Sequence, residues 1–215
     1  MTPDAVATYL KQHPEFFEQY ADMLAEIVIP HPHGGRAIPI SERQILTLRD
    51  KGKQLEVKLR ELIEYGEEND ALGEKLHRLA LTLIGARDLE TVDELLYASL
   101  GEDFAVPHIA LRLWPEGTVS PLPEFAPVSA GAREFAESLT SPYCGTRAIL
   151  DTAGWFGEAA PLLKSFAYVA LRNGDRTIGL LALASEDAQR FYPEMGTLYL
   201  KRLGELIAAA VLRCL

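Results

Sequence analysis

Two cysteines, Cys144 and Cys214, are the residues of this chain whose chemistry could be covalent or redox. Two thiols are too few for a disulfide framework, and they suit a reducing compartment. Cys144 is the candidate for a redox-active thiol, because Cys214 falls at the end of a predicted helix. A single cysteine is more often a small buried hydrophobe. The sequence therefore favours a packing role for Cys144 over an enzyme that uses it.

Histidines and arginines are the next candidates for a site. His31 and His33, together with His13, have the residue type of metal ligands, but Pro and Gly surround the first two and predict a turn. No Asp, Glu or Cys stands at ligand spacing beside them, so no metal site is predicted. His108 and Arg112 share one face of an alternating segment. The guanidinium fork of an arginine can bind an anion there, and the alternative is the exposed surface of an edge strand.

Sequence motifs for enzymatic chemistry are absent. The chain contains no GxSxG, P-loop, HExxH, CxxC or GxGxxG element. We therefore expect no catalytic residue and no cofactor, and we interpret the protein as a non-enzyme.

Composition narrows the class of protein. The 215 residues are 48% hydrophobic and 24% charged, as in a globular protein, and the net charge is −10. An acidic chain repels phosphate, which argues against binding to nucleic acid or to an anionic membrane. No apolar run is long enough for a membrane helix, and the N-terminus lacks the basic region of a signal peptide. We expect a cytoplasmic protein.

A long charged helix is predicted in the middle of the chain. Residues 41–90 hold 11 acidic and 9 basic residues, a pattern typical of a solvated helix. Ser41 with Gln44 three residues later is a capping box, and no proline follows until Pro107. Few helices of globular proteins exceed 25 residues, so a helix over residues 41–86 indicates a coiled coil or helical spacer.

Heptad spacing indicates where this helix would dimerise. Leucines recur every seven residues in one phase, with Asn69 in the same phase, while the companion phase is mostly small residues. An Asn within such a seam fixes register, which favours two parallel strands. The alternative is two shorter helices that fold back at one of three glycines. The predicted dimerisation residues are Leu48, Leu55, Leu59, Leu62, Asn69 and Leu76. The later phase Leu72, Leu76, Leu79 and Leu83 can also pack on a globular domain.

The remaining segments divide the chain into three parts. Residues 1–40 predict short helices broken at Pro14 and followed by a loop, residues 41–87 the long helix, and residues 88–215 a globular domain. Within that domain we expect helices over 88–101 and 129–139 and from Phe191 onwards, and strands over 106–114, 166–172 and 176–184. Mixed helices and hairpins predict the α+β class with an antiparallel sheet.

The Asn173-Gly174 pair predicts a hairpin and its register. A two-residue turn at these positions would place Tyr168 opposite Gly179. One face would then be wholly apolar and carry helices, whereas the other would mix aromatic and polar groups and suit a small ligand. The predicted ligand-binding residues on this mixed face are His108, Arg112, Phe166, Tyr168, Thr177 and Gly179.

Two stretches carry a resemblance to known proteins. Residues 178–187, then Arg190-Phe191, residues 194–197 and the last helix, resemble the C-terminal half of a GAF domain. The segments Tyr9-Leu10, His13-Pro14, Phe16-Phe17, Pro30-His31, residues 41–44 and Glu68-Asn69 are similar to the bacterial GAF-like family of unknown function numbered four-eight-four. The resemblance implies a GAF/PAS-like sheet of about six antiparallel strands flanked by helices, dimerised through N-terminal helices. It implies no activity.

The sequence lacks the motifs of two kinds of GAF domain, which argues against their functions here. Those that bind cyclic nucleotides share an Asn-Lys pair, and here Asn occurs only at positions 69 and 173, without a following Lys. GAF-type methionine-sulfoxide reductases use several cysteines, whereas Cys144 has no resolving partner. The leading hypothesis is a non-catalytic, homodimeric signalling sensor or adaptor for an unknown small ligand or protein partner. The alternative is a structural interaction module whose pocket is filled by its own Phe166, Tyr168 and Leu181.

Overall fold

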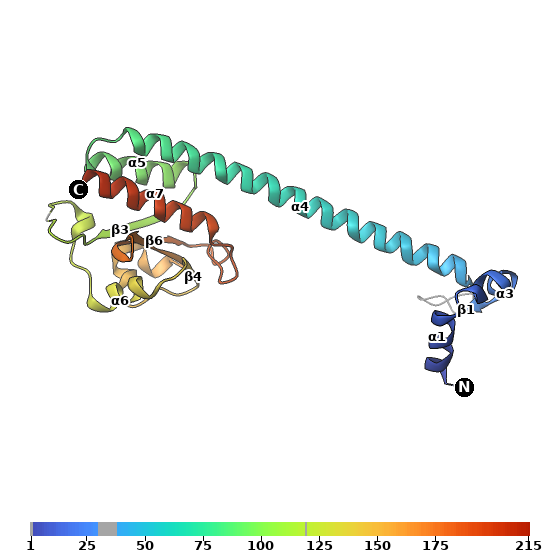
Figure 1. Cartoon of the computed structure of the whole chain (residues 1–215). Coiled ribbons are helices and arrows are strands. Elements are labelled where there is room, and N and C mark those ends of the chain that lie inside the picture. The colour runs from blue at the N-terminus through green and yellow to red at the C-terminus, as the bar shows by residue number, and fades with distance from the viewer. Residues whose placement is uncertain (1, 30–37, 119) are drawn as a thin grey trace. The chain divides into compact units, whose positions relative to one another are not determined.

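The structure, a computed structural model, describes residues 2–29, 38–118 and 120–215, without the side chains of 24–26, 28–29 and 38–42 (Figure 1). It divides into two compact units, Met1–Glu67 and Glu68–Leu215, and the division falls within the longest helix. The globular unit therefore begins ahead of the boundary expected at residue 88.

The first unit consists of short helices and a two-stranded ribbon. α1 (Pro3–Gln12) begins at Thr2, whose side chain accepts a hydrogen bond from the Ala5 amide. α2 (Glu15–Gln19) and α3 (Ala21–Glu26) follow the break at Pro14 and are separated at Tyr20, where one helix was expected. β1 (Val28–Ile29) pairs antiparallel with β2 (Ile38–Pro39). The predicted turn at His31 and His33 lies outside the described residues.

α4 (Ile40–Gly85) is a continuous helix of 46 residues, close to the predicted range of 41–86. It contains no break at Gly52, Gly66 or Gly73, and nothing lies within 4 Å of a Cβ added at these glycines. α4 begins at Ile40, one residue before the predicted start, and the predicted capping box rests on Ser41, whose side chain lies outside the described part of the structure.

A four-stranded antiparallel sheet forms the centre of the second unit. Its strands are β3 (His108–Leu113), β4 (Tyr143–Gly145), β5 (Ser165–Asn173) and β6 (Arg176–Ser185), in the order β3-β6-β5-β4. The predicted α+β class with an antiparallel sheet flanked by helices is confirmed. In the described chain this sheet has four strands rather than the six implied by the resemblance. The segments between the strands carry prolines, which lack the N–H that a sheet ladder needs, and form the 3₁₀ helices η1 (Pro123–Phe125) and η2 (Thr152–Leu162).

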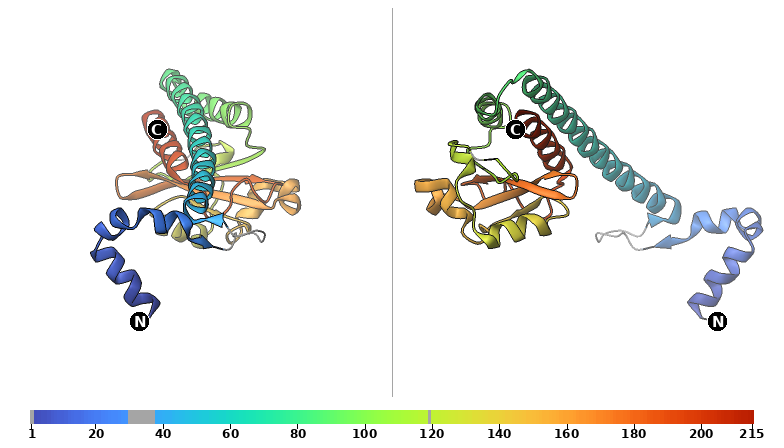
Figure 2. Two further views of the ribbon diagram at one scale, coloured as in Figure 1. Left: turned by 90° about the vertical axis from the view of Figure 1, so that its right-hand side faces the viewer. Right: turned by 60° about the vertical axis from the view of Figure 1, so that its left-hand side comes forward.

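Two helices, α5 (Leu89–Glu102) and α7 (Leu198–Cys214), cover one face of the sheet, and the C-terminal part of α4 lies against these helices (Figures 1 and 2). α5 is capped by Asp88 as predicted. α7 begins seven residues later than expected, after Pro193 and Gly196. The predicted packing of the last leucines of α4 on the domain is confirmed, since they join the buried core shared with α5, α7 and the sheet. Core residues from the helices include Leu79, Leu83, Val92, Leu96, Leu100, Leu203 and Ile207.

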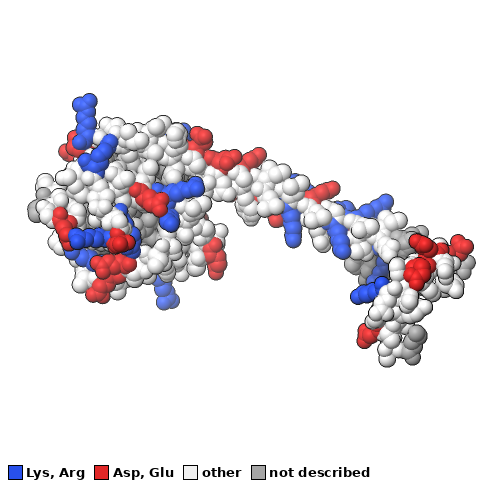
Figure 3. Space-filling view, in the orientation of Figure 1, with Lys and Arg blue, Asp and Glu red and all other residues white. Residues whose placement is uncertain are grey.

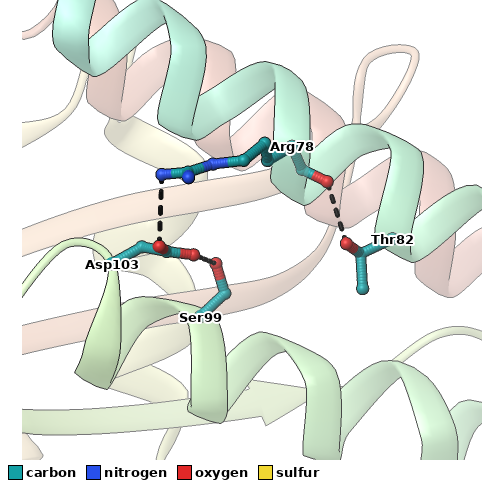
Figure 4. Close-up of polar contacts among 4 residues, drawn as sticks. All are labelled: Arg78, Thr82, Ser99 and Asp103. Atoms are coloured by element: carbon teal, nitrogen blue, oxygen red, sulfur yellow. Dashed lines mark hydrogen bonds and ion pairs between the residues drawn. The ribbon is translucent and has the colours of Figure 1, made fainter.

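Polar contacts also join α4 to α5 (Figure 4). Arg78 Nη2 donates to Asp103 Oδ1 at 3.3 Å, and Ser99 Oγ donates to Asp103 Oδ2 at 3.1 Å. Within α4, Thr82 Oγ1 donates to the Arg78 carbonyl at 2.9 Å. Together with the leucine core, these contacts make the end of α4 part of the globular unit.

The opposite face of the sheet is covered by α6 (Ala130–Ser138) and η2. Ser129 caps α6 as predicted, because its side chain accepts from the Ala132 amide at 3.2 Å. A second buried cluster lies here, separate from the core beneath α4, α5 and α7. It consists of Ala110, Ala136, Phe166, Tyr168, Leu180, Ala182 and Ala184.

The β5–β6 hairpin is confirmed, but the predicted register is wrong. Asn173 pairs with Arg176, so the turn is Gly174-Asp175, with Gly174 at φ +59°. A bulge between Leu171 and Arg172 shifts the ladder further, and Tyr168 faces Ala182 instead of Gly179. Beyond the bulge the displacement is an odd number of residues, so the side chains of β6 from Gly179 onwards lie on the opposite face of the sheet to the one predicted.

Candidate functional site

The mixed face of the sheet brings together four of the six predicted ligand-binding residues. His108 pairs with Ala184, and Arg112 pairs with Leu180. Phe166 and Tyr168 pair with Ala184 and Ala182, which belong to the same buried cluster. These four residues therefore share the face covered by α6 and η2.

The register excludes Gly179 from this face. Gly179 pairs with Leu171 and Leu113, whose side chains lie in the core beneath α4, α5 and α7. A Cβ added at Gly179 would lie 2.7 Å from the Arg112 carbonyl oxygen, so this glycine allows close approach of a strand rather than of a ligand. Thr177 pairs with Arg172 near the hairpin turn, away from Tyr168. Leu181, expected to fill the pocket, also lies on the other face.

Tyr168 is fully buried, and its hydroxyl is satisfied by the chain itself. Thr152 Oγ1 donates to the Ile149 carbonyl at 2.6 Å, so the Tyr168 hydroxyl donates to Thr152 Oγ1, also at 2.6 Å. The Ile149 amide in turn donates to the Tyr168 hydroxyl at 3.2 Å. Burial raises the pKa of Tyr168 above its ordinary value. The Tyr168 hydroxyl thus forms bonds to two groups of its own chain, Ile149 and Thr152.

Aromatic rings fill the space above this face. Phe135 of α6 meets the Tyr168 ring edge-on, with centroids 5.6 Å apart, and Phe166 stacks parallel to Tyr168 at 6.4 Å. Phe156 of η2 lies 6.2 Å from Phe166. Such arrangements add to the free energy gained by burial. The face that we predicted to receive a ligand is therefore packed by the side chains of its own domain.

His108 and Arg112 lie at the margin of this packed face. The Arg112 guanidinium carbon is 5.4 Å from the Trp155 ring centroid, and Arg112 Nη1 donates to the Leu111 carbonyl at 2.7 Å. His108 Nε2 is 3.8 Å from Glu186 Oε1. Both side chains are thus engaged by neighbouring residues, and the anion site predicted for them stays a prediction.

Cys144 lies on the other face of the sheet, in the core beneath α4, α5 and α7. It pairs with Ala167, and burial raises the pKa of its thiol to about 11. At neutral pH the sulfur is a thiol, the less nucleophilic form. These surroundings match the packing role that the sequence favours.

A groove of about 800 Å³ lies at the hairpin end of the sheet, outside the predicted site. The Arg133 guanidinium carbon is 5.5 Å from the Trp114 ring centroid, and Arg176 is paired with Glu116. Sequence reasoning missed this groove because its lining comes from segments distant in the chain. Three arginines and three acidic residues line it together, so its charges balance: Arg133, Arg172, Arg176, Glu116, Glu137 and Asp175.

Arg172 in this groove has a structural task. Its Nη2 donates to the carbonyls of Ala136, Glu137 and Leu139 at 3.3, 2.9 and 2.8 Å, at the C-terminus of α6. A cation at this position satisfies carbonyls that have no partner within the helix.

Replacing Arg172 with alanine is expected to lower the free energy of unfolding by about 1 kcal/mol, because three carbonyls lose a charged donor. Urea denaturation measures the change. Arg176→Ala is the matched control, since its ion pair with Glu116 is exposed to solvent, and it should change stability by less than about 0.5 kcal/mol. Equal effects of the two substitutions would contradict the capping role of Arg172.

A buried pair of carboxyl groups is a second feature that the sequence did not reveal. Glu124 on η1 is buried, with an exposed fraction of 5%, and it lies against Asp93 on α5. Burial, and then the charge of Glu124, raise the pKa of Asp93 to about 7. Within the described residues, Asp93 Oδ1 and Glu124 Oε2 lack hydrogen-bond partners. The two groups are 31 positions apart in the sequence, so no local pattern joins them.

The predicted dimerisation residues differ in their surroundings. Leu48, Leu55, Leu59 and Leu62 are 58–67% exposed on α4, and we name these four the α4 seam. Asn69 is exposed, and its carbonyl accepts a hydrogen bond from Tyr199. Leu76 packs against the core of the second unit. Among the described residues, the seam thus comprises the leucines of the predicted interface that stay exposed.

The described residues were also searched for metal sites and for membrane-spanning helices. In the part of the chain that the structure describes, no cluster of three or more His, Cys, Asp or Glu is placed to hold a metal ion. Among the described helices, none is both long enough and apolar enough to cross a membrane.

The family comparison agrees with the family resemblance noted in the sequence. A family model described as "Protein of unknown function, DUF484" matches residues 1–214. The uncharacterized protein YigA of Salmonella typhimurium is 23% identical over 218 residues, which cover 94% of this chain and 88% of that protein. The GAF domain of an Acinetobacter phosphoenolpyruvate-protein phosphotransferase is similar in structure, with a TM-score of 0.45 and 14% identity over 66% of this chain and 92% of that one.

Proposed function

The chain belongs to the DUF484 family, whose function is unknown, and from its structure we propose that it is a non-catalytic, homodimeric adaptor protein. The observation that carries the proposal is the α4 seam, whose four leucines are 58–67% exposed. Burying a leucine side chain contributes about 1.5–3 kcal/mol. A second copy that covers the seam therefore gains this free energy on both helices.

The packed sheet face supports an adaptor over a sensor of a small ligand. Phe166 and Tyr168 are buried by α6 and η2, and the Tyr168 hydroxyl has partners within the chain. A ligand on this face would have to displace aromatic rings that already contact each other. We therefore assign the function to contacts between proteins, first of all between two α4 helices in parallel.

Light scattering coupled to size-exclusion chromatography tests the dimer. The chain has a mass of 23.7 kDa, and we expect twice this mass at micromolar concentration. The double variant Leu55→Lys/Leu62→Lys should elute with the monomer mass, because it places four lysines in the seam of the dimer.

Val57→Lys is the matched control for this experiment. Val57 is also exposed on α4, but its heptad position lies outside the seam, so this variant should keep the dimer mass. A monomeric wild-type protein, or a dimer that survives the double substitution, would refute the proposed function.

A second candidate function is the binding of a small ligand in the groove beside the hairpin. The stacked Trp114 and Arg133 and the volume of about 800 Å³ favour it. Native mass spectrometry of the protein purified from its host should then show an added mass that Trp114→Ala removes. A mass equal to that of the polypeptide alone would exclude a ligand retained on purification.

A further inference from the structure

The N-terminal helices expose large apolar side chains. α2 has five residues and α3 has six, and isolated helices of this length are marginal in water. Among the side chains described between residues 2 and 67, none is buried. The exposed apolar side chains of this segment, 37–49% accessible, are Val6, Tyr9, Phe17, Tyr20, Met23 and Ile27. These helices therefore lack a core within their own unit.

Charge indicates what covers them. The segment from Pro3 to Glu26 carries five acidic residues and a single basic residue, Lys11. The first part of α4, from Arg43 to Arg60, carries six basic residues and two acidic ones. Figure 3 shows the blue side chains gathered along this part of α4, with red ones further along the helix. The two surfaces are thus complementary in charge.

We propose that α1–α3 of one copy dock on the basic N-terminal part of α4 in the second copy. The inference rests on the proposed parallel dimer, in which two basic helices lie side by side and repel each other. Acidic helices laid over them remove this repulsion and bury their own aromatic side chains. Within a single chain both surfaces stay exposed, the α4 seam as well as the apolar side chains of α1–α3. In the dimer, α4 of the second copy therefore covers the apolar side chains of α1–α3.

Charge reversal in two full-length variants tests the docking. The first is Glu18→Lys/Asp22→Lys on α2 and α3, and the second is Lys53→Glu/Arg60→Glu on α4. Lys53 and Arg60 are seven residues apart, share one side of α4 and lie outside the seam, so the dimer is kept. Hydrogen exchange of the α1–α3 amides measures docking, and light scattering measures the dimer independently.

In the wild-type dimer we expect these amides to exchange at least tenfold more slowly than in an unstructured chain. Each variant alone should lose this protection while keeping the dimer mass. A mixed dimer of the two variants, purified through two different tags, should regain it, because each acidic surface then faces a basic one. Docking of α1–α3 on their own α4 would leave the mixed dimer unprotected.

The outcomes separate this inference from the proposed function. A wild-type dimer with unprotected α1–α3, or a mixed dimer that stays unprotected, overturns the docking and leaves the adaptor dimer in place. A monomeric wild-type protein overturns both. Protection that returns only in the mixed dimer supports docking between copies.

Discussion

Replacing Tyr168 with alanine is expected to lower the free energy of unfolding by about 3–5 kcal/mol. The side chain is fully buried, contacts Phe135 and Phe166, and donates to Thr152. Its removal leaves a cavity and also leaves the Ile149 amide without its hydrogen-bond acceptor. Tyr168→Phe removes only the hydroxyl and should cost about 1–2 kcal/mol. Urea denaturation followed by tryptophan fluorescence measures both changes.

Tyr192→Ala is the control for loss of an aromatic ring from the same unit. Tyr192 is 42% exposed, so its replacement should change stability by less than about 0.5 kcal/mol. A small cost for Tyr168→Ala would mean that the mixed face is open in solution. That result would restore the sheet face as a ligand pocket and weaken the adaptor proposal.

Replacing Asp93 with asparagine is expected to stabilise the protein above neutral pH by about 2 kcal/mol. The pKa of Asp93 is about 7 in the folded chain, above the ordinary aspartate value of 3.8, so folding favours the protonated form. The stability that this proton contributes is complete below pH 4 and is lost as the pH rises through 7. Asparagine is neutral at every pH and escapes this loss. The expected 2 kcal/mol is about half of the free energy that corresponds to a pKa change from 3.8 to about 7, because solvent screens the partly exposed Asp93 carboxyl.

Unfolding free energies measured between pH 4 and 8 test this expectation. The difference between Asp93→Asn and the wild type should grow with pH, and Glu90→Gln, an exposed residue of α5 that does not act on Asp93, should give a nearly constant difference. Besides Glu124, the nearby groups are Glu94, Tyr97 and Arg112, so the pair has charged neighbours on α5 and β3. A pH-independent difference for Asp93→Asn would show that folding does not raise the pKa of Asp93.

Local sequence patterns predicted most elements of this fold. Asp88 and Ser129 cap α5 and α6, and alternation along residues 106–114 placed Ile109, Leu111 and Leu113 on the core face of β3. The heptads predicted α4 to within about one residue at each end. The start of α7 was predicted too early, because an apolar residue such as Phe191 can be buried by a loop as well as by a helix.

The candidate site was only partly predictable. His108, Arg112, Phe166 and Tyr168 do share one face, since alternation within a strand is a local property. Gly179 and Leu181 were assigned to the wrong face, because a turn one residue later and a bulge at Leu171 displaced β6 against β5. The rings of Phe135 and Phe156, which cover this face, come from α6 and η2, and the sequence pattern of the strands does not predict which segments pack on them.

The sequence by itself determined the acidic charge, the α+β class, the single long helix and its leucine seam, because composition, capping and periodicity are properties of neighbouring residues. Only the tertiary structure decided which faces are covered. It closed the mixed face with aromatic rings, brought Asp93 against Glu124, and left the α4 seam exposed. Such choices depend on the register of strands and the packing of distant segments, where a shift of one residue exchanges a buried side chain for an exposed one.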